Sequence, residues 1–220
     1  MGSAGCVKAD AAEIAISMYT PKLNLIIDQQ EAVSFMQRYS FATIVTVKDG
    51  VPTATHLPFV VKDVDGKVIV VSHFAKANPQ SSDIVGNRAL VIFTEPHAYV
   101  SPKNYEKEQN VPTWNYLAVH AYGNCAILDS EEEKVALLAE TIKYYDADYL
   151  KQYDSLPDDY KQKMMKGIVA FQITVDDLQA KKKLSQNRSE KERENIIESL
   201  GKSEDQNEQD IAAYMSVRNK

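Results

Sequence analysis

The chain has 220 residues, of which 44% are hydrophobic and 25% charged, and its formal net charge is −6. This is the composition of an ordinary globular protein with one large domain or two small ones, long enough to build a core without disulfides. No apolar run approaches the length needed to cross a bilayer, and the acidic balance disfavours a broad nucleic-acid-binding surface.

The cysteines and the first residues bear on where the protein works. Cys6 and Cys125 are too few for a disulfide framework and lack metal-type spacing, so we expect a reduced, cytoplasmic protein. Cys125 lies in an apolar run, which favours a small buried thiol. Residues 1–17 lack the features of a secretory signal and are interpreted as a flexible leader or cloning remnant ahead of Met18.

The first predicted element is a short amphipathic helix. Asp28 and Glu31 form a capping-box-like start. The apolar residues behind them recur at helical spacing: Ala32, Phe35, Met36 and Tyr39.

From Phe41 onward the pattern is typical of β-strands, with many β-branched residues. Asp49-Gly50 and Asp65-Gly66 supply hairpin turns, and Gly123 is expected to bend the longest strand. The predicted strands cover 41–47, 53–61, 67–73, 88–95, 98–101 and 114–128.

The second half of the chain contains more helix. Ser130 with Glu133 predicts a capped helix, and residues 144–165 are polar and tyrosine-rich, which indicates an irregular helical excursion. A further strand is predicted over 167–175. Ser189 with Glu192 then opens a third capped helix.

Many short strands with hairpin signals, framed by a few helices, favour an α+β barrel over a parallel sheet. We expect the barrel domain at 18–201. Residues 202–220 are expected to be a charged connector and a short helix packed on that domain.

Three polar clusters interrupt the apolar strands: 53–56, 73–80 and 181–189. Asn78-Pro79 is typical of a helix cap followed by proline at the first helical position. The unpaired N–H groups at the N-terminus of such a helix, with Lys76 beside them, would make a phosphate-binding site. The residues alone therefore predict a barrel with an edge that suits anions.

Plainer interpretations stay open for the same residues. Asn78 on its own would only cap a helix, and Lys181 to Lys183 have the pattern of a solvated charge run. None of the four histidines has the spacing of a metal-ligand pair, and His120 is expected to be a hydrogen-bonded core residue.

Six motifs occur in order along the chain: MYTPK at 18–22, ATHLP at 54–58, HFAKANPQ at 73–80, PHAYVSP at 96–102, VPTWNY at 111–116 and KLSQNRS at 183–189. Together they resemble the PaiB-type family, described as FMN-binding negative transcriptional regulators, from Met18 to about Met215. That family is similar to the split barrels of pyridoxamine-phosphate oxidases and flavin reductases. The resemblance implies a six-stranded antiparallel Greek-key split β-barrel with peripheral helices, which forms a homodimer with FMN at the interface.

The resemblance also implies roles for the residues that match its motifs. Lys76 and Asn78 would hold the FMN phosphate, where relatives often carry arginine in place of Lys76 and so gain a bidentate contact. The further residues implied near the phosphate, the ribityl chain and the ring edge are Thr55, His56, His73 and Gln80. The residues implied to line the interface or to close the site from the second subunit are Trp114, Tyr116, Lys183, Ser185, Gln186 and Asn187. Lys183 is the candidate cation near the ring.

Three functions compete on this basis. In a repressor of transcription, DNA contact would fall on residues 181–193, which hold six Lys/Arg against two Glu. An FMN-dependent oxidoreductase using NAD(P)H would need no nucleophile or metal ligand from the protein. A haem-binding barrel would use His56, His73 or His97 as axial ligand.

Overall fold

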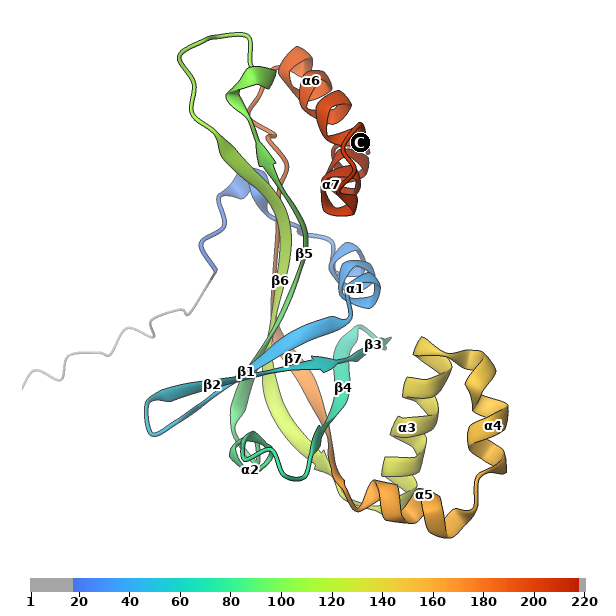
Figure 1. The fold of residues 1–220 in the computed structure, drawn as a ribbon. Helices are drawn as coiled ribbons and strands as arrows, with labels where there is room; N and C mark the ends of the chain where they lie inside the picture. Colours follow the sequence, from blue (N-terminus) through green and yellow to red (C-terminus); the bar gives the residue numbers. More distant parts are fainter. Residues whose placement is uncertain (1–17, 218–220) are drawn as a thin grey trace, which may run out of the picture.

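The structure, a computed structural model, describes residues 18–217, and the expected leader at 1–17 lies outside them. These residues form one seven-stranded antiparallel sheet surrounded by helices (Figure 1). The strands are β1 (Phe41–Lys48), β2 (Val51–Pro58), β3 (Val60–Val64), β4 (Lys67–Ala75), β5 (Arg88–Val100), β6 (Thr113–Leu128) and β7 (Ile168–Lys183). Their order in the sheet is β2-β1-β5-β6-β7-β4-β3.

The two edge strands of this sheet, β2 and β3, are separated in the chain by Phe59 alone. The sheet must therefore curl until its edges meet, and the Ser72 hydroxyl in β4 donates to the Pro58 carbonyl in β2 at 2.7 Å. The expected antiparallel split β-barrel with peripheral helices is confirmed. The single strand expected over 53–61 is wrong, because the chain changes partners at Phe59: its N–H donates to the Ser40 carbonyl at 2.8 Å, and from Val60 onward the chain pairs with β4 instead of β1. This break accounts for the seven strands found where six were implied.

Three long strands, β5, β6 and β7, form the spine of the molecule (Figure 1). The two strands expected over 88–95 and 98–101 are one strand with a register shift between Thr94 and His97. At Gly123, where a bend was expected, β6 has a second register shift, and a Cβ at that position would lie 2.2 Å from the Thr174 carbonyl oxygen. β7 continues eight residues beyond its predicted end at 175 and reaches Lys183.

The helices frame this spine. They are α1 (Gln29–Arg38), α2 (Gln80–Asp83), α3 (Glu131–Tyr145), α4 (Leu150–Ser155), α5 (Asp158–Met165), α6 (Glu190–Gly201) and α7 (Gln206–Ser216). The capping box of Ser130 and Glu133 is complete. At α1 the Asp28 side chain accepts from the Gln30 N–H, while Glu31 pairs with Lys182 in β7 instead.

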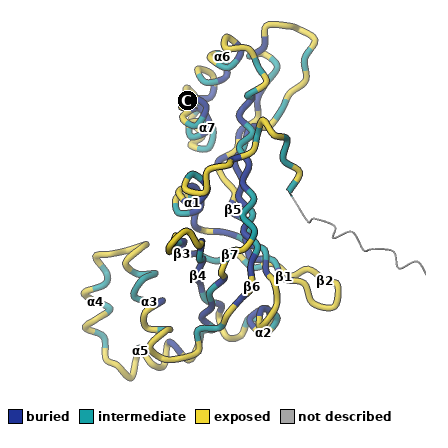
Figure 2. Tube along the Cα trace, turned by 180° about the vertical axis from the view of Figure 1, so that it is seen from behind, coloured by how far each residue is buried: buried dark blue, intermediate teal, exposed yellow. Residues whose placement is uncertain are grey.

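Apart from α1, which lies beside the middle of the spine, the helices lie toward its two ends (Figure 1). α6 and α7 lie at one end, and α2 lies at the other. The predicted excursion forms α4 and α5, which with α3 make a largely exposed group beside β3 and β4 (Figure 2). Leu137 of α3 anchors the group in a buried cluster with Val71 and Ala170 of the sheet. No helix within 18–217 is long and apolar enough to cross a membrane.

The core fills the inside of the barrel and holds four fully buried phenylalanines. Phe59 packs edge-on against Phe93 and Phe171, with ring centroids 5.9 and 6.2 Å apart. Cys125 is buried as expected, and burial raises the pKa of its thiol to about 12.

Candidate functional site

The site residues expected from the sequence fall into two clusters. We call the first the β2–α2 cluster: Thr55, His56, His73, Lys76, Asn78 and Gln80. The second is the β6–β7 cluster: Trp114, Tyr116, Lys183, Ser185, Gln186 and Asn187. Ala75 pairs with Ile168 at the start of β7, whereas Tyr116 pairs with Lys183 at its end. Lys76 and Lys183 therefore lie near opposite ends of β7, whose 16 residues have a contour length of about 50 Å.

Thr55, Asn78 and Gln80 form a closed hydrogen-bond network. The Thr55 hydroxyl donates to Gln80 Oε1 at 2.6 Å and accepts from Asn78 Nδ2 at 3.0 Å. Asn78 Oδ1 accepts from the backbone N–H of Gln80 at 3.0 Å. Gln80 is fully buried, and its Nε2 donates to the Thr46 hydroxyl and the Thr53 carbonyl of the β1–β2 hairpin. Gln80 therefore positions its neighbours rather than facing solvent.

The remaining members of the β2–α2 cluster are more open. His56 is exposed and its ring stacks on Phe41, with centroids 6.4 Å apart. His73 is half-buried, and desolvation lowers its pKa, which favours the neutral imidazole. Lys76 is exposed, and its backbone N–H donates to the Gly167 carbonyl at 2.8 Å. The helix that follows, α2, has only four residues, so the cationic side chain of Lys76 is the main anion-attracting feature of this end.

The β6–β7 cluster borders a largely apolar pocket of about 490 Å³. The pocket is lined by Met18, Thr94, Glu95, Pro96, His97, Trp114, Tyr116, Leu117, Ala118 and His120. Trp114 is 50% exposed and meets His97 and Tyr99 edge-on, with ring centroids 5.3 and 6.0 Å away. The exposed indole ring of Trp114 gives the pocket a flat wall that suits a planar aromatic ligand.

His120 lines the pocket, although the sequence pattern assigned it to the core rather than to the site. Its Nδ1 is buried and has no hydrogen-bond partner among the described residues, so the expectation of a hydrogen-bonded core histidine is not met at that atom. Desolvation lowers the pKa of His120 and keeps the imidazole neutral. The sequence could have predicted His120 as a pocket residue from the alternation of residues along β6, because this alternation puts His120 on the same strand face as Trp114 and Tyr116.

Two lysines lie beside the pocket and have no acidic partner among the described residues. Lys181 is 6% exposed; its Nζ donates to the Tyr19 carbonyl at 2.8 Å and lies 5.2 Å from the ring centroid of Tyr116. Lys183 donates to the Trp114 carbonyl at 2.8 Å, and burial lowers the pKa of its ammonium. Within residues 18–217 no ion pair joins either lysine to a carboxylate. The interpretation of this segment as a solvated charge run is therefore wrong.

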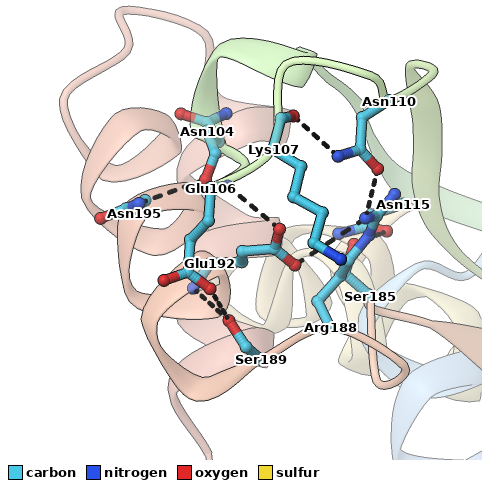
Figure 3. A network of polar contacts seen from close by, with 10 residues as sticks. All are labelled: Asn104, Glu106, Lys107, Asn110, Asn115, Ser185, Arg188, Ser189, Glu192 and Asn195. Atoms are coloured by element: carbon cyan, nitrogen blue, oxygen red, sulfur yellow. Dashed lines mark hydrogen bonds and ion pairs between the residues drawn. The ribbon is translucent and has the colours of Figure 1, made fainter.

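The KLSQNRS segment otherwise serves as an anchor (Figure 3). The Ser185 hydroxyl donates to Asn115 Oδ1 at 3.0 Å, and Arg188 donates to Asn110 Oδ1 at 2.8 Å. Gln186 binds backbone groups of its own segment, accepting from the Leu184 N–H at 2.7 Å. These contacts fasten the loop between β5 and β6 to the start of α6. Of the segment's predicted ligand residues, Asn187 is exposed, whereas Ser185 and Gln186 already have partners.

The pocket has aromatic walls, and the lysines beside it have no acidic partner within residues 18–217. A split barrel with these features belongs to the class of proteins that can bind an anionic aromatic cofactor. This chain belongs to the family described as "Putative FMN-binding domain", whose model matches residues 18–177. FMN is the cofactor for which that family is defined, and the PaiB-type resemblance is confirmed.

Relatives support both the family and the fold. The chain is 41% identical over 202 residues to the protease synthase and sporulation protein PAI 2 of Bacillus subtilis (strain 168), covering 90% of this chain and 96% of that protein. Its fold is similar to that of the FAD and haem binding protein from Mycobacterium smegmatis, with a TM-score of 0.59, 16% identity, and coverage of 72% and 73%. It is also similar to the flavocytochrome Anf3 from Azotobacter vinelandii, with a TM-score of 0.53, 14% identity, and coverage of 71% and 67%.

The side chains present fit FMN. The cofactor joins a dianionic phosphate to a planar, amphipathic ring, so it needs cations at one end and apolar or aromatic walls at the other. The β2–α2 cluster offers Lys76 for the phosphate, and the β6–β7 cluster offers Trp114, Tyr116 and the unpaired lysines for the ring. The buried Nδ1 of His120, which has no hydrogen-bond partner within residues 18–217, gives the apolar wall of the pocket one polar group that can bind a ligand.

Proposed function

We propose that two copies of this chain form a homodimer that binds FMN between its subunits. The observation that carries the proposal is that Lys76 and Lys183 lie near opposite ends of β7, whose 16 residues have a contour length of about 50 Å. One FMN molecule cannot span that length. A site built from both clusters therefore needs the β2–α2 cluster of one subunit and the β6–β7 cluster of its partner.

In this proposal each cluster has its own task. Lys76 binds the phosphate, and Thr55 and Asn78 contribute polar groups that the buried amide of Gln80 holds in place. Exposed His56 and half-buried His73 lie toward the ribityl chain. FMN supplies the electron-transfer chemistry when it is bound.

At the other end, Trp114 and Tyr116 provide the wall for the ring. Lys183 provides positive charge near the ring edge, supported by Lys181 two residues earlier on the same strand face. Ser185 and Gln186 keep the KLSQNRS segment in shape through their internal hydrogen bonds, which leaves exposed Asn187 for a direct contact.

The PaiB-type relationship makes negative regulation of transcription the proposed role of the flavin-bound dimer. The basic segment 181–193 gives little support to direct DNA contact, because its charges are already engaged. Lys181 is buried, Lys182 pairs with Glu31 at 2.7 Å, and Arg193 donates to the Met215 carbonyl at 3.2 Å. We therefore propose that the regulatory effect depends on flavin binding rather than on direct DNA contact by this segment.

An FMN-dependent oxidoreductase using NAD(P)H is the second candidate. It is favoured by the open apolar pocket of about 490 Å³, which leaves room beside Trp114 for a second planar ligand. Rapid reduction of bound flavin by NADH or NADPH would support it, and flavin that resists both would exclude this reductase role. A Soret band on haem titration, lost in His97→Ala, would instead favour a haem-binding barrel.

The proposal is tested by FMN titration of co-expressed, differently tagged subunits that carry Lys76→Ala in one and Lys183→Ala in the other. If each site draws on both subunits, the mixed dimer keeps one site with both lysines and loses both lysines from the other. We expect half the sites to bind with wild-type affinity.

Each homodimeric variant should bind FMN more weakly by about 1.5–3 kcal/mol. Exposed Lys67, at the far end of β4, supplies the matched control Lys67→Ala. Two equally weakened sites in the mixed dimer would overturn the intersubunit site, and an absence of binding to the wild type at tens of micromolar FMN would overturn the flavin proposal.

A further inference from the structure

A pocket of about 230 Å³ lies where the barrel meets the helical group α3–α5. Three lysines from three separate segments line it: Lys76 after β4, Lys134 in α3 and Lys166 after α5. Its other lining residues are Ile127, Asp129, Met165, Ile168 and Val169. A second pocket of about 280 Å³ adjoins it and shares Lys134 and Lys166.

The backbone explains why these lysines converge. The Lys76 N–H donates to the Gly167 carbonyl at 2.8 Å, and the Gly167 N–H donates to the Met164 carbonyl at 3.0 Å. These bonds join the end of β4 to the end of α5. Lys134 lies in the first turn of α3, and its side chain is only 19% exposed. The lysines therefore stand on fixed backbone rather than on free loops.

The charges of the pocket are not balanced. Asp129 is the one carboxylate in its lining; it pairs with Lys134 at 3.2 Å, but its side chain is 90% exposed, so the pair is weak. Within the part of the chain that the structure describes, no ion pair joins Lys76 or Lys166 to a carboxylate. Buried Met165 and half-buried Ile127 and Ile168 form an apolar wall, which strengthens attraction to an anion.

We propose that Lys76, Lys134 and Lys166 bind the phosphate group of a phosphate monoester. Three ammonium groups around one small pocket can donate to several oxygens of such a group and neutralise its two charges. The phosphate comes either from FMN itself, in which case the inference rests on the proposed function, or from a separate phosphorylated small molecule that binds beside the flavin.

Calorimetric titrations of the full chain distinguish these sources. The variant is Lys134→Gln/Lys166→Gln. The control is Lys143→Gln/Lys163→Gln, which removes one exposed lysine from α3 and one from α5. The ligands are FMN, riboflavin, which lacks the phosphate, and glycerol 3-phosphate. Melting temperatures of both variants verify that the fold is retained.

If the pocket holds the FMN phosphate, the variant loses roughly 10-fold or more in FMN affinity and none in riboflavin affinity, and the control loses neither. If it serves a separate ligand, glycerol 3-phosphate binds FMN-saturated wild type and the control but not the variant. Binding of glycerol 3-phosphate to a wild type that fails to bind FMN would support the pocket while removing the flavin proposal. Unchanged FMN affinity in the variant, together with no lysine-dependent binding of glycerol 3-phosphate, would overturn the inference.

Discussion

The Thr55 hydroxyl donates a 2.6 Å hydrogen bond to Oε1 of Gln80, and this bond ties the middle of β2 to the first residue of α2. The amide nitrogen of Gln80 completes the connection by donating to Thr46 and Thr53 on the same hairpin. An isolated hairpin of exposed residues would be marginal on its own. One buried glutamine therefore joins the edge of the barrel that carries Thr55 to α2, in addition to the ladder between β1 and β2.

Gln80→Leu should lower the free energy of unfolding by about 2–3 kcal/mol, because it leaves buried partners on β1 and β2 without hydrogen bonds. Urea denaturation followed by circular dichroism measures the change. Exposed Gln109 gives the control Gln109→Leu, for which we expect less than about 0.5 kcal/mol. A loss as small as the control's would show that Gln80 is not the anchor of the hairpin.

Gly123→Ala and Gly201→Ala should shift stability in opposite directions. A Cβ at Gly123 would lie 2.2 Å from the Thr174 carbonyl, so β6 and β7 must move apart, at a cost of about 1–3 kcal/mol. At Gly201, the last residue of α6, the nearest atom is Ala212 Cβ at 3.9 Å, and alanine should stabilise the helix by about 0.5 kcal/mol. Thermal unfolding of the two variants measures whether each substitution raises or lowers the stability. A Gly123→Ala variant as stable as the wild type would contradict the close approach of β6 and β7.

Stability should fall on acidification below pH 6.5, partly because of His73. Its pKa is lowered by burial in the folded state, so the unfolded chain takes up the proton first. Protonation therefore stabilises the unfolded chain relative to the folded chain. Each such histidine contributes at most about 1.4 kcal/mol per pH unit. His73→Gln should flatten the dependence measured by urea denaturation from pH 7.5 to 5.5, whereas exposed His97→Gln should leave more of it in place. Equal slopes in the two variants would remove His73 as a cause.

The Cys125 thiol should resist alkylation in the native protein. Burial raises its pKa to about 12, so the reactive thiolate is scarce at neutral pH. Peptide mapping after iodoacetamide treatment should find the peptide containing Cys125 unmodified in buffer and modified in urea. Fast labelling in buffer would mean that β6 opens locally on the timescale of the reaction.

Lys183→Gln should lower the midpoint reduction potential of bound FMN, because a cation near the ring favours added negative charge. We expect a change of roughly 30 mV, equivalent to about 1.4 kcal/mol for two electrons. Redox titration against a reference dye measures it. Lys22→Gln, in the short turn before α1, is the control. A potential unchanged by Lys183→Gln would separate that lysine from the flavin ring.

Much of this fold could be predicted because its local signals agree with its tertiary structure. Asp49-Gly50 and Asp65-Gly66 lie in the turns of two hairpins, and all four residues have positive φ. The extent of β7 could not be predicted, because Asp176, Asp177 and the lysines that follow have the composition of a loop. They form a strand because β6 supplies a ladder along their whole length. That pairing is a long-range contact that local propensity does not encode.

The candidate site was predicted residue by residue from motifs, but its arrangement was not. The motifs do not reveal that Gln80 is buried or that Lys181 is enclosed by Tyr19 and Tyr116, since both depend on strand pairing. The convergence of Lys134 and Lys166 with Lys76 also depends on how the excursion packs against the barrel. Such convergence of distant segments requires the three-dimensional structure.

The order of strands has a consequence for synthesis on the ribosome. β4 pairs with β7, and Val70 meets Ile173, which is translated about 100 residues later. At 5–20 residues per second, the β3–β4 hairpin waits roughly 5–20 s for its partner. During that interval its unpaired backbone is open to strands of neighbouring nascent chains. A chain stalled before Ile168 cannot seal its barrel, so efficient production depends on uninterrupted translation through β7.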